Sequence, residues 1–109
     1  MKGMPNMGNL LKQAQQFQAR MAKLQEELGE RTVEASAGGG MVTVVANGRQ
    51  ELLSIKIDPE VIHPEEAEML QDLILAAVND ALSRAKNMVN EEMGKLTQGL
   101  NLPNIPGLI

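Results

Sequence analysis

The apolar residues of this chain follow two helical patterns separated by a region of alternating residues. In the first pattern they recur alternately four and three residues apart from Leu10 to Leu28, the spacing of a heptad seam that packs against another long helix. Asn9 is a suitable N-cap before the seam and Gly29 a suitable stop after it, so we predict a helix over residues 9–28. The seam consists of Leu10, Ala14, Phe17, Met21, Leu24 and Leu28.

The middle of the chain has the pattern of a three-stranded antiparallel sheet. The strands are expected at residues 32–36, 41–46 and 50–57. Gly38–Gly40 links the first two strands, and Asn47-Gly48 links the second to the third, a dipeptide typical of tight hairpins because both positions tolerate positive φ. Leu52 and Leu53 are adjacent, so a bulge there would decide which of them faces the core, and the sequence leaves both possibilities open.

The second helical pattern runs from Pro64 to Gly99 and is long for so small a chain. Such a helix would measure about 50 Å, whereas a compact chain of this length has a radius of gyration of about 13 Å. The helix must therefore project from its domain. Asn79-Asp80 in its middle can face solvent, or can bond to the sheet or to a second subunit. The apolar stripe has small residues that would let another helix approach. It consists of Leu70, Ile74, Ala77, Ala81, Ala85 and Met88, and the first five are expected at a dimer interface.

The order of these elements predicts an α+β fold: long helix, three-stranded antiparallel sheet, long helix. We expect residues 9–98 to form a single domain, preceded by a flexible N-terminus at residues 1–8 and followed by a flexible C-terminal tail at residues 99–109. The two helices are expected to run antiparallel, with the start of the first and the end of the last lying together away from the sheet.

Composition removes most catalytic and metal chemistry. The chain has no cysteine and one histidine, His63, which excludes disulfides, thiolate catalysis and multi-histidine metal sites. Gly38–Gly40 lacks the Gly-Lys-Ser/Thr ending of a phosphate-binding loop. We therefore expect no enzyme activity, metal, cofactor or small-molecule substrate. The N-terminus does not resemble a signal peptide and no segment reaches transmembrane length, so a cytoplasmic protein with no membrane partner is expected.

The charge is segregated along the chain. A net charge of −4 by itself argues against nonspecific binding of nucleic acid. However, residues 1–25 carry four bases and no acid, whereas residues 58–80 carry seven acids and no base. The basic surface can be an ordinary solvated helix face, or it can contact phosphates. With one aromatic residue in the chain, duplex binding is favoured over the base stacking that single strands need.

Five motifs occur in order along the chain: Asn9–Glu30, Gly38–Gly40, Asn47-Gly48, the run IKIDP at Ile55–Pro59, and Asn79–Ala81. Together they closely resemble the YbaB/EbfC family of bacterial nucleoid-associated proteins, over residues 4–100. The resemblance implies a tweezer-like homodimer in which two sheets join and helical arms project. It also implies binding to DNA, a change of DNA conformation, and roles in nucleoid organisation and gene regulation.

We therefore expect a nucleoid-associated protein of the cytoplasm whose partners are double-stranded DNA and a second copy of itself. The residues expected to contact DNA are Lys12, Gln16, Arg20, Lys23, Arg84, Lys86 and Lys95. The joined sheets and the alanine-containing stripe of the long helix are expected to form the dimer interface. The alternative is a scaffold module whose heptad arms bind partner helices without DNA.

Overall fold

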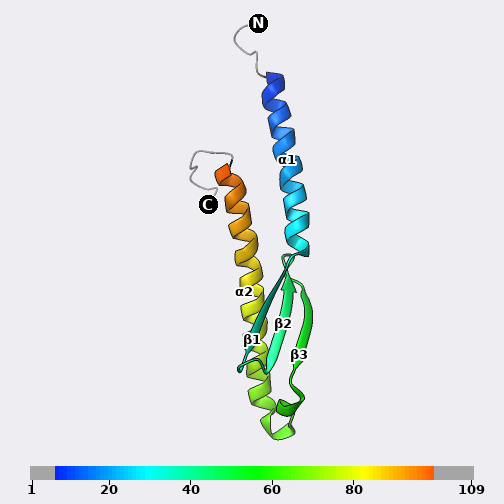
Figure 1. Ribbon diagram of the computed structural model, residues 1–109, viewed down its shortest axis with the longest axis vertical. Helices are drawn as coiled ribbons and strands as arrows, with labels where there is room; N and C mark the ends of the chain where they lie inside the picture. Colours follow the sequence, from blue (N-terminus) through cyan, green and yellow to red (C-terminus); the bar gives the residue numbers. More distant parts are fainter. Residues whose placement is uncertain (1–6, 100–109) are drawn as a thin grey trace.

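A computed structural model describes residues 7–99 of the chain (Figure 1). The elements follow in the order α1 (Met7–Glu30), β1 (Thr32–Ala37), β2 (Val42–Asn47), β3 (Leu52–Ile57), the short 3-10 turns η1 (Pro59–Val61) and η2 (Pro64–Glu66), and α2 (Ala67–Gly99). This confirms the predicted α+β order. The radius of gyration is 21.2 Å, far above that of a compact chain of this length, and the molecule measures 79 × 25 × 16 Å.

The predicted chain ends fall largely outside the described residues. Of the N-terminal segment 1–8, only Met7 and Gly8 are described, and both belong to α1 rather than to a flexible lead-in. Of the C-terminal segment 99–109, only Gly99 is described, as the last residue of α2.

α2 covers one face of the sheet, and this contact forms the core. The strands lie in the order β1-β2-β3 with antiparallel pairing. Val42, Val44 and Ala46 alternate along β2 with less buried residues, and all three are fully buried on the face that α2 covers. Figure 1 shows α2 running behind β1 and β2 and continuing past the end of the sheet.

The alanine stripe of α2 corrects one sequence prediction. Ala77, Ala81 and Ala85 have 0% exposed surface and pack into the core of this chain. Leu70 and Ile74 are partly buried against the same core. The stripe expected to contact a second subunit therefore covers the chain's own sheet, and its small side chains let the helix approach the strands closely.

β3 is the uncovered part of the sheet. Leu52 and Ile55 point to the same face as the buried β2 residues opposite them, yet 42% and 45% of their surface is exposed. A bulge between Val45 and Ala46 pairs Leu52 with Ala46 and leaves Leu53 without a partner in the register. Of the two adjacent leucines, Leu52 therefore shares the face of the core, although α2 does not cover it.

The predicted hairpin at Asn47-Gly48 is confirmed, but glycine is required there for another reason than positive φ. Among the described non-glycine residues, positive φ occurs at Gln50 (61°), two positions beyond Gly48. A Cβ on Gly48 would instead overlap the carbonyl oxygen of Leu28 at the end of α1. Gly48 is therefore needed because the turn lies directly against α1, and its amide donates to the carbonyl of Arg31.

Buried Asn47 holds this turn together. Its side-chain oxygen accepts from the amides of Arg49 and Glu51 at 2.9 and 3.0 Å, and its side-chain nitrogen donates to the Glu51 carboxylate at 2.8 Å. An asparagine that bonds to the backbone in this way fixes a turn without positive φ at its own position.

The heptad seam of α1 loses cover with distance from the sheet. Leu28 is 1% exposed, Phe17, Met21 and Leu24 are half-buried, and Leu10 is 61% exposed. The seam therefore packs within this chain near its base and is open at its distal end. Below, the arms are α1 and residues 89–99 of α2, and the body is the sheet with residues 67–88 of α2.

Candidate nucleic-acid interface

The basic face of α1 is exposed along its length. Lys12, Gln16, Arg20 and Lys23 follow at spacings of four, four and three residues, which places them on one face of the helix. All four side chains are exposed, and none of the three cations makes an ion pair with another described residue. α1 extends well beyond the sheet (Figure 1), so these charges lie at a distance from the body.

The acids of α1 are confined to its base. Glu26, Glu27 and Glu30 occupy the last two turns, next to the sheet, and the earlier part of the helix has none. The helix is thus basic where it projects and acidic where it joins the body. An anionic ligand would therefore be attracted to the projecting part.

The predicted cations of α2 differ in their surroundings. Arg84 pairs with Asp80 through Nε and Oδ2 at 3.1 Å, and Lys95 pairs with Glu92 through Nζ and Oε1 at 3.3 Å. Lys86 is exposed and has no ion pair within residues 7–99. The structure also places Arg84 and Lys86 on the body and only Lys95 on an arm. Asn79 is exposed beside the Asp80–Arg84 pair, so Asn79-Asp80 lies on the solvent side of α2.

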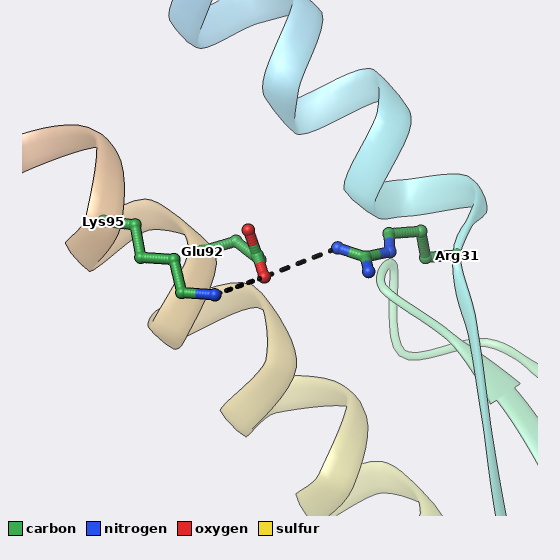
Figure 2. Close-up of polar contacts among 3 residues, drawn as sticks. All are labelled: Arg31, Glu92 and Lys95. Atoms are coloured by element: carbon green, nitrogen blue, oxygen red, sulfur yellow. Dashed lines mark hydrogen bonds and ion pairs between the residues drawn. The ribbon is translucent and has the colours of Figure 1, made fainter. Parts of the chain in front are cut away.

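Glu92 joins the base of the two arms. The same oxygen that contacts Lys95 lies 3.6 Å from Nη1 of Arg31, the residue between α1 and β1, as Figure 2 shows. The carboxylate is 27% exposed, and the two cations are more than half exposed. This contact links the chain just after α1 to the point where α2 leaves the sheet.

Sequence reasoning missed Arg49. It lies in the β2–β3 turn, and with Gly48 and Gln50 it lines a cleft of about 160 Å³ whose other wall is Lys86, Val89 and Asn90 of α2. Packing of the turn brings Arg49 and Lys86 together from distant parts of the sequence. The Asn47-Gly48 signal placed Arg49 in a hairpin, but nothing in the pattern indicated which part of α2 that hairpin would face.

Residues 7–99 contain neither a cluster of metal-ligating side chains nor a helix suited to a membrane. No group of three or more histidines, cysteines or acids is arranged to hold a metal ion there. None of the described helices is both long enough and apolar enough to cross a membrane.

The chain is similar to several known proteins. A protein of Moorella thermoacetica described as a nucleoid-associated protein is 64% identical over 93% of this chain and 97% of its own length. Another with the same description, from Pelotomaculum thermopropionicum, is 58% identical over 92% of this chain and 95% of its own. The crystal structure of the uncharacterized protein HP0035 from Helicobacter pylori matches with a TM-score of 0.57 and 26% identity, covering 80% of this chain and 96% of that one.

The family comparison agrees with these relatives and with the resemblance in the motifs. The model of the YbaB/EbfC DNA-binding family matches residues 3–100, nearly the whole chain and all of the described helices and strands. The protein therefore belongs to the YbaB/EbfC DNA-binding family of nucleoid-associated proteins.

Proposed function

We propose that this protein binds duplex DNA through phosphate contacts of α1, supported by Lys86 at the base of the arms. The observation that carries the proposal is the basic face of α1, where Lys12, Arg20 and Lys23 are exposed and have no ion pair with a described residue. Such cations can neutralise DNA phosphates, which supplies affinity but little sequence information. Gln16 lies on the same face as a neutral donor, and Arg84 and Lys95 would contribute less because acids already neutralise them.

A second copy of the chain is the occupant we propose for the open side of β3. Leu75, Leu82 and Val89 recur every seven residues along one side of α2, and Val89 lines the same cleft as the turn that leads into β3. That side of the helix therefore flanks the exposed face of β3. We call Leu52, Ile55, Leu75 and Leu82 the β3 patch; the first three are at least 42% exposed.

The orientation of this dimer decides where the arms lie. If β3 paired antiparallel with β3 of a second copy, the two-fold axis would be perpendicular to the sheet and the arms would point in opposite directions. A tweezer with both pairs of arms on one side requires an axis that runs along the strands. We therefore propose that the β3 patches pack side by side, without a continuous sheet across the dimer, which departs from the joined sheets that the resemblance implies.

A change of DNA conformation would follow from this geometry. The arms are helices with cations at fixed spacing, so a duplex that contacts several of them must adapt its own path. We propose that the protein organises the nucleoid in the cytoplasm in this way, and that it influences gene expression by changing the shape of DNA.

The sharpest test replaces the three α1 cations. In the variant Lys12→Ala, Arg20→Ala, Lys23→Ala we expect DNA affinity to fall strongly and the log–log salt dependence to become shallower by about 0.9 for each phosphate that is no longer neutralised. The matched control is Gln15→Ala, Gln18→Ala, Gln25→Ala, three exposed α1 residues without charge. Fluorescence anisotropy of a labelled duplex over a series of salt concentrations measures both quantities.

The outcome separates the proposal from its alternative. If the cation variant binds DNA as well as the glutamine control does, α1 does not contact phosphates. If the unaltered protein binds no duplex at low salt, the exposed distal end of the α1 seam, with Leu10 and Leu11 more than 60% exposed, would instead favour binding of a partner helix. A complex of that kind would change little with salt.

A further inference from the structure

The cleft between the β2–β3 turn and α2 has the chemistry of a phosphate site. We infer that Arg49 and Lys86, on its two walls, together hold one backbone phosphate of a duplex that the arms bind. This inference rests on the proposed function and adds Arg49, which the sequence pattern did not indicate, to the contact proposed for Lys86 at the base of the arms.

The residues that line the cleft suit a phosphate. Arg49 and Lys86 supply two positive charges, and Gln50 and Asn90 supply amide donors. None of the residues that line it is acidic, and neither cation forms an ion pair with another described residue. A volume of about 160 Å³ with an open mouth would admit a phosphate that remains attached to a nucleic-acid strand.

The turn holds Arg49 in a defined place. Asn47 is 5% exposed and bonds the backbone of the turn on both sides of Arg49. The Arg49 side chain also lies across the end of α1, where a Cβ on Gly29 would come within 3.0 Å of its Nε. A cation fixed in this way loses less conformational freedom on binding than a lysine on an exposed helix.

The backbone amides of the turn are already used, so side chains must do the binding. The amide of Gly48 donates to Arg31, those of Arg49 and Glu51 donate to the Asn47 side chain, and that of Gln50 donates to the Asn47 carbonyl. This differs from a glycine-rich phosphate loop, in which backbone amides bind the anion. Replacing Arg49 should therefore remove most of the affinity of the cleft.

The location favours DNA over a free anion. The cleft lies where α2 passes the end of the sheet, and the α1 arm begins on the other side of the same turn. A duplex that contacts the α1 cations and continues towards the body would bring its backbone to this point. A free phosphate would need only the cleft, and its binding would be independent of the arms.

The test measures DNA affinity and its salt dependence for Arg49→Gln. We expect about tenfold weaker binding and a salt slope shallower by about 0.9, as when one phosphate is no longer neutralised. Arg49→Lys should keep the slope because it keeps the charge. Lys56→Gln is the matched control, since it removes one exposed charge from the outer face of the sheet, opposite Thr43.

A second measurement tests whether the two cations share a phosphate. In the double variant Arg49→Gln, Lys86→Gln, the fold-loss of DNA affinity should be smaller than the product of the fold-losses in the two single variants. Groups that hold one ligand are energetically coupled, so their effects do not multiply. Far-UV circular dichroism of each variant checks the fold. If Arg49→Gln disturbs the base of α1, the single variant Lys86→Gln replaces it, because it removes the cation on the other wall of the cleft.

Each result has a definite meaning. If the unaltered protein binds DNA and the α1 variant does not, but Arg49→Gln binds like Lys56→Gln, the cleft inference is wrong and the proposed function stands. Single effects that simply multiply in the double variant would exclude a shared phosphate. If inorganic phosphate shifts the amide resonances of Gly48 and Gln50 while duplex DNA does not, the cleft binds a free anion and the inference is also overturned. Absence of DNA binding in the unaltered protein would overturn both proposals.

Discussion

In the body, α2 lies so close to β1 and β2 that Ala77, Ala81 and Ala85 retain no exposed surface, whereas along α1 the apolar seam passes from 1% exposed at Leu28 to 61% at Leu10. The body is thus stabilised by burial, and the arms have little contact with it beyond their base. The charges differ in the same way: Lys12, Arg20 and Lys23 of α1 form no ion pair with a described residue, while two of the three α2 cations are paired with acids. Because a fold depends on what it buries, changes to the buried residues of the body should alter stability, whereas changes to exposed residues should alter binding.

The largest expected effect comes from the exposed apolar side of the body, the β3 patch. In Ile55→Asp, each copy would bring one carboxylate into the proposed dimer contact. The dissociation constant of the dimer should therefore rise by about 100-fold or more. Because Ile55 is 45% exposed in the single chain, the monomer should stay folded. Sedimentation equilibrium measures the dissociation constant.

Ser54→Asp is the control for this experiment, because Ser54 lies opposite Val45 on the other face of the sheet. We expect this variant to remain a dimer. A dimer that survives Ile55→Asp, or an unaltered protein that sediments as a monomer, would contradict the proposed interface.

A smaller effect is expected when the same substitution, alanine to leucine, is made once in the body and once in α1. Ala81→Leu adds volume where α2 meets the sheet with no exposed surface, and should destabilise the protein by about 1–3 kcal/mol. Ala14→Leu makes the same change on the exposed part of α1 and should alter stability by less than about 0.5 kcal/mol. Helix propensity is nearly equal for the two residue types, so it does not explain the difference.

Urea unfolding followed by far-UV circular dichroism measures both variants, since the chain has no Trp or Tyr for fluorescence. Equal destabilisation of the two variants would mean that α1 is packed as tightly as the body, contrary to its exposed surface.

The fold was largely predictable because its signals are local. The alternation in residues 41–46, the Asn47-Gly48 dipeptide and the long helical pattern each need only neighbours in the sequence. The sequence indicated a bulge at Leu52-Leu53, but not which of the two leucines faces the core. What periodicity could not reveal was whether the alanine stripe covers the chain's own sheet or a second copy, because both require the same small, apolar residues.

The candidate site was predictable only in part, for a related reason. Helical spacing placed Lys12, Arg20 and Lys23 on one face, and the structure agrees. Whether a cation is neutralised depends on rotamers and on nearby acids, so the pairing of Lys95 with Glu92 was not foreseen. Arg49 was missed because its position beside Lys86 depends on tertiary packing of the turn.

The smallest expected effect concerns the contact that links the two regions. Glu92 joins Arg31 to α2 by a partly exposed ion pair. Surface pairs contribute about 0.2–1 kcal/mol, so Glu92→Gln should change the free energy of unfolding by about that much. The position of α1 relative to α2 should be affected more than stability, because few buried contacts hold the arm. Spin labels on Gln13→Cys and Asn87→Cys report this distance without interference, since the chain has no cysteine of its own.

In protein diluted with an excess of unlabelled chains, we expect the distance distribution to broaden in Glu92→Gln and also in the unaltered protein at high salt, which screens exposed pairs. Glu91→Gln is the control, because it removes the same charge from the adjacent exposed position, for which no ion pair with a described residue exists. If the two variants give equally narrow distributions, the base of α1 is fixed by its contacts with the β2–β3 turn and not by Glu92, and the arm is as rigidly attached as the body is packed.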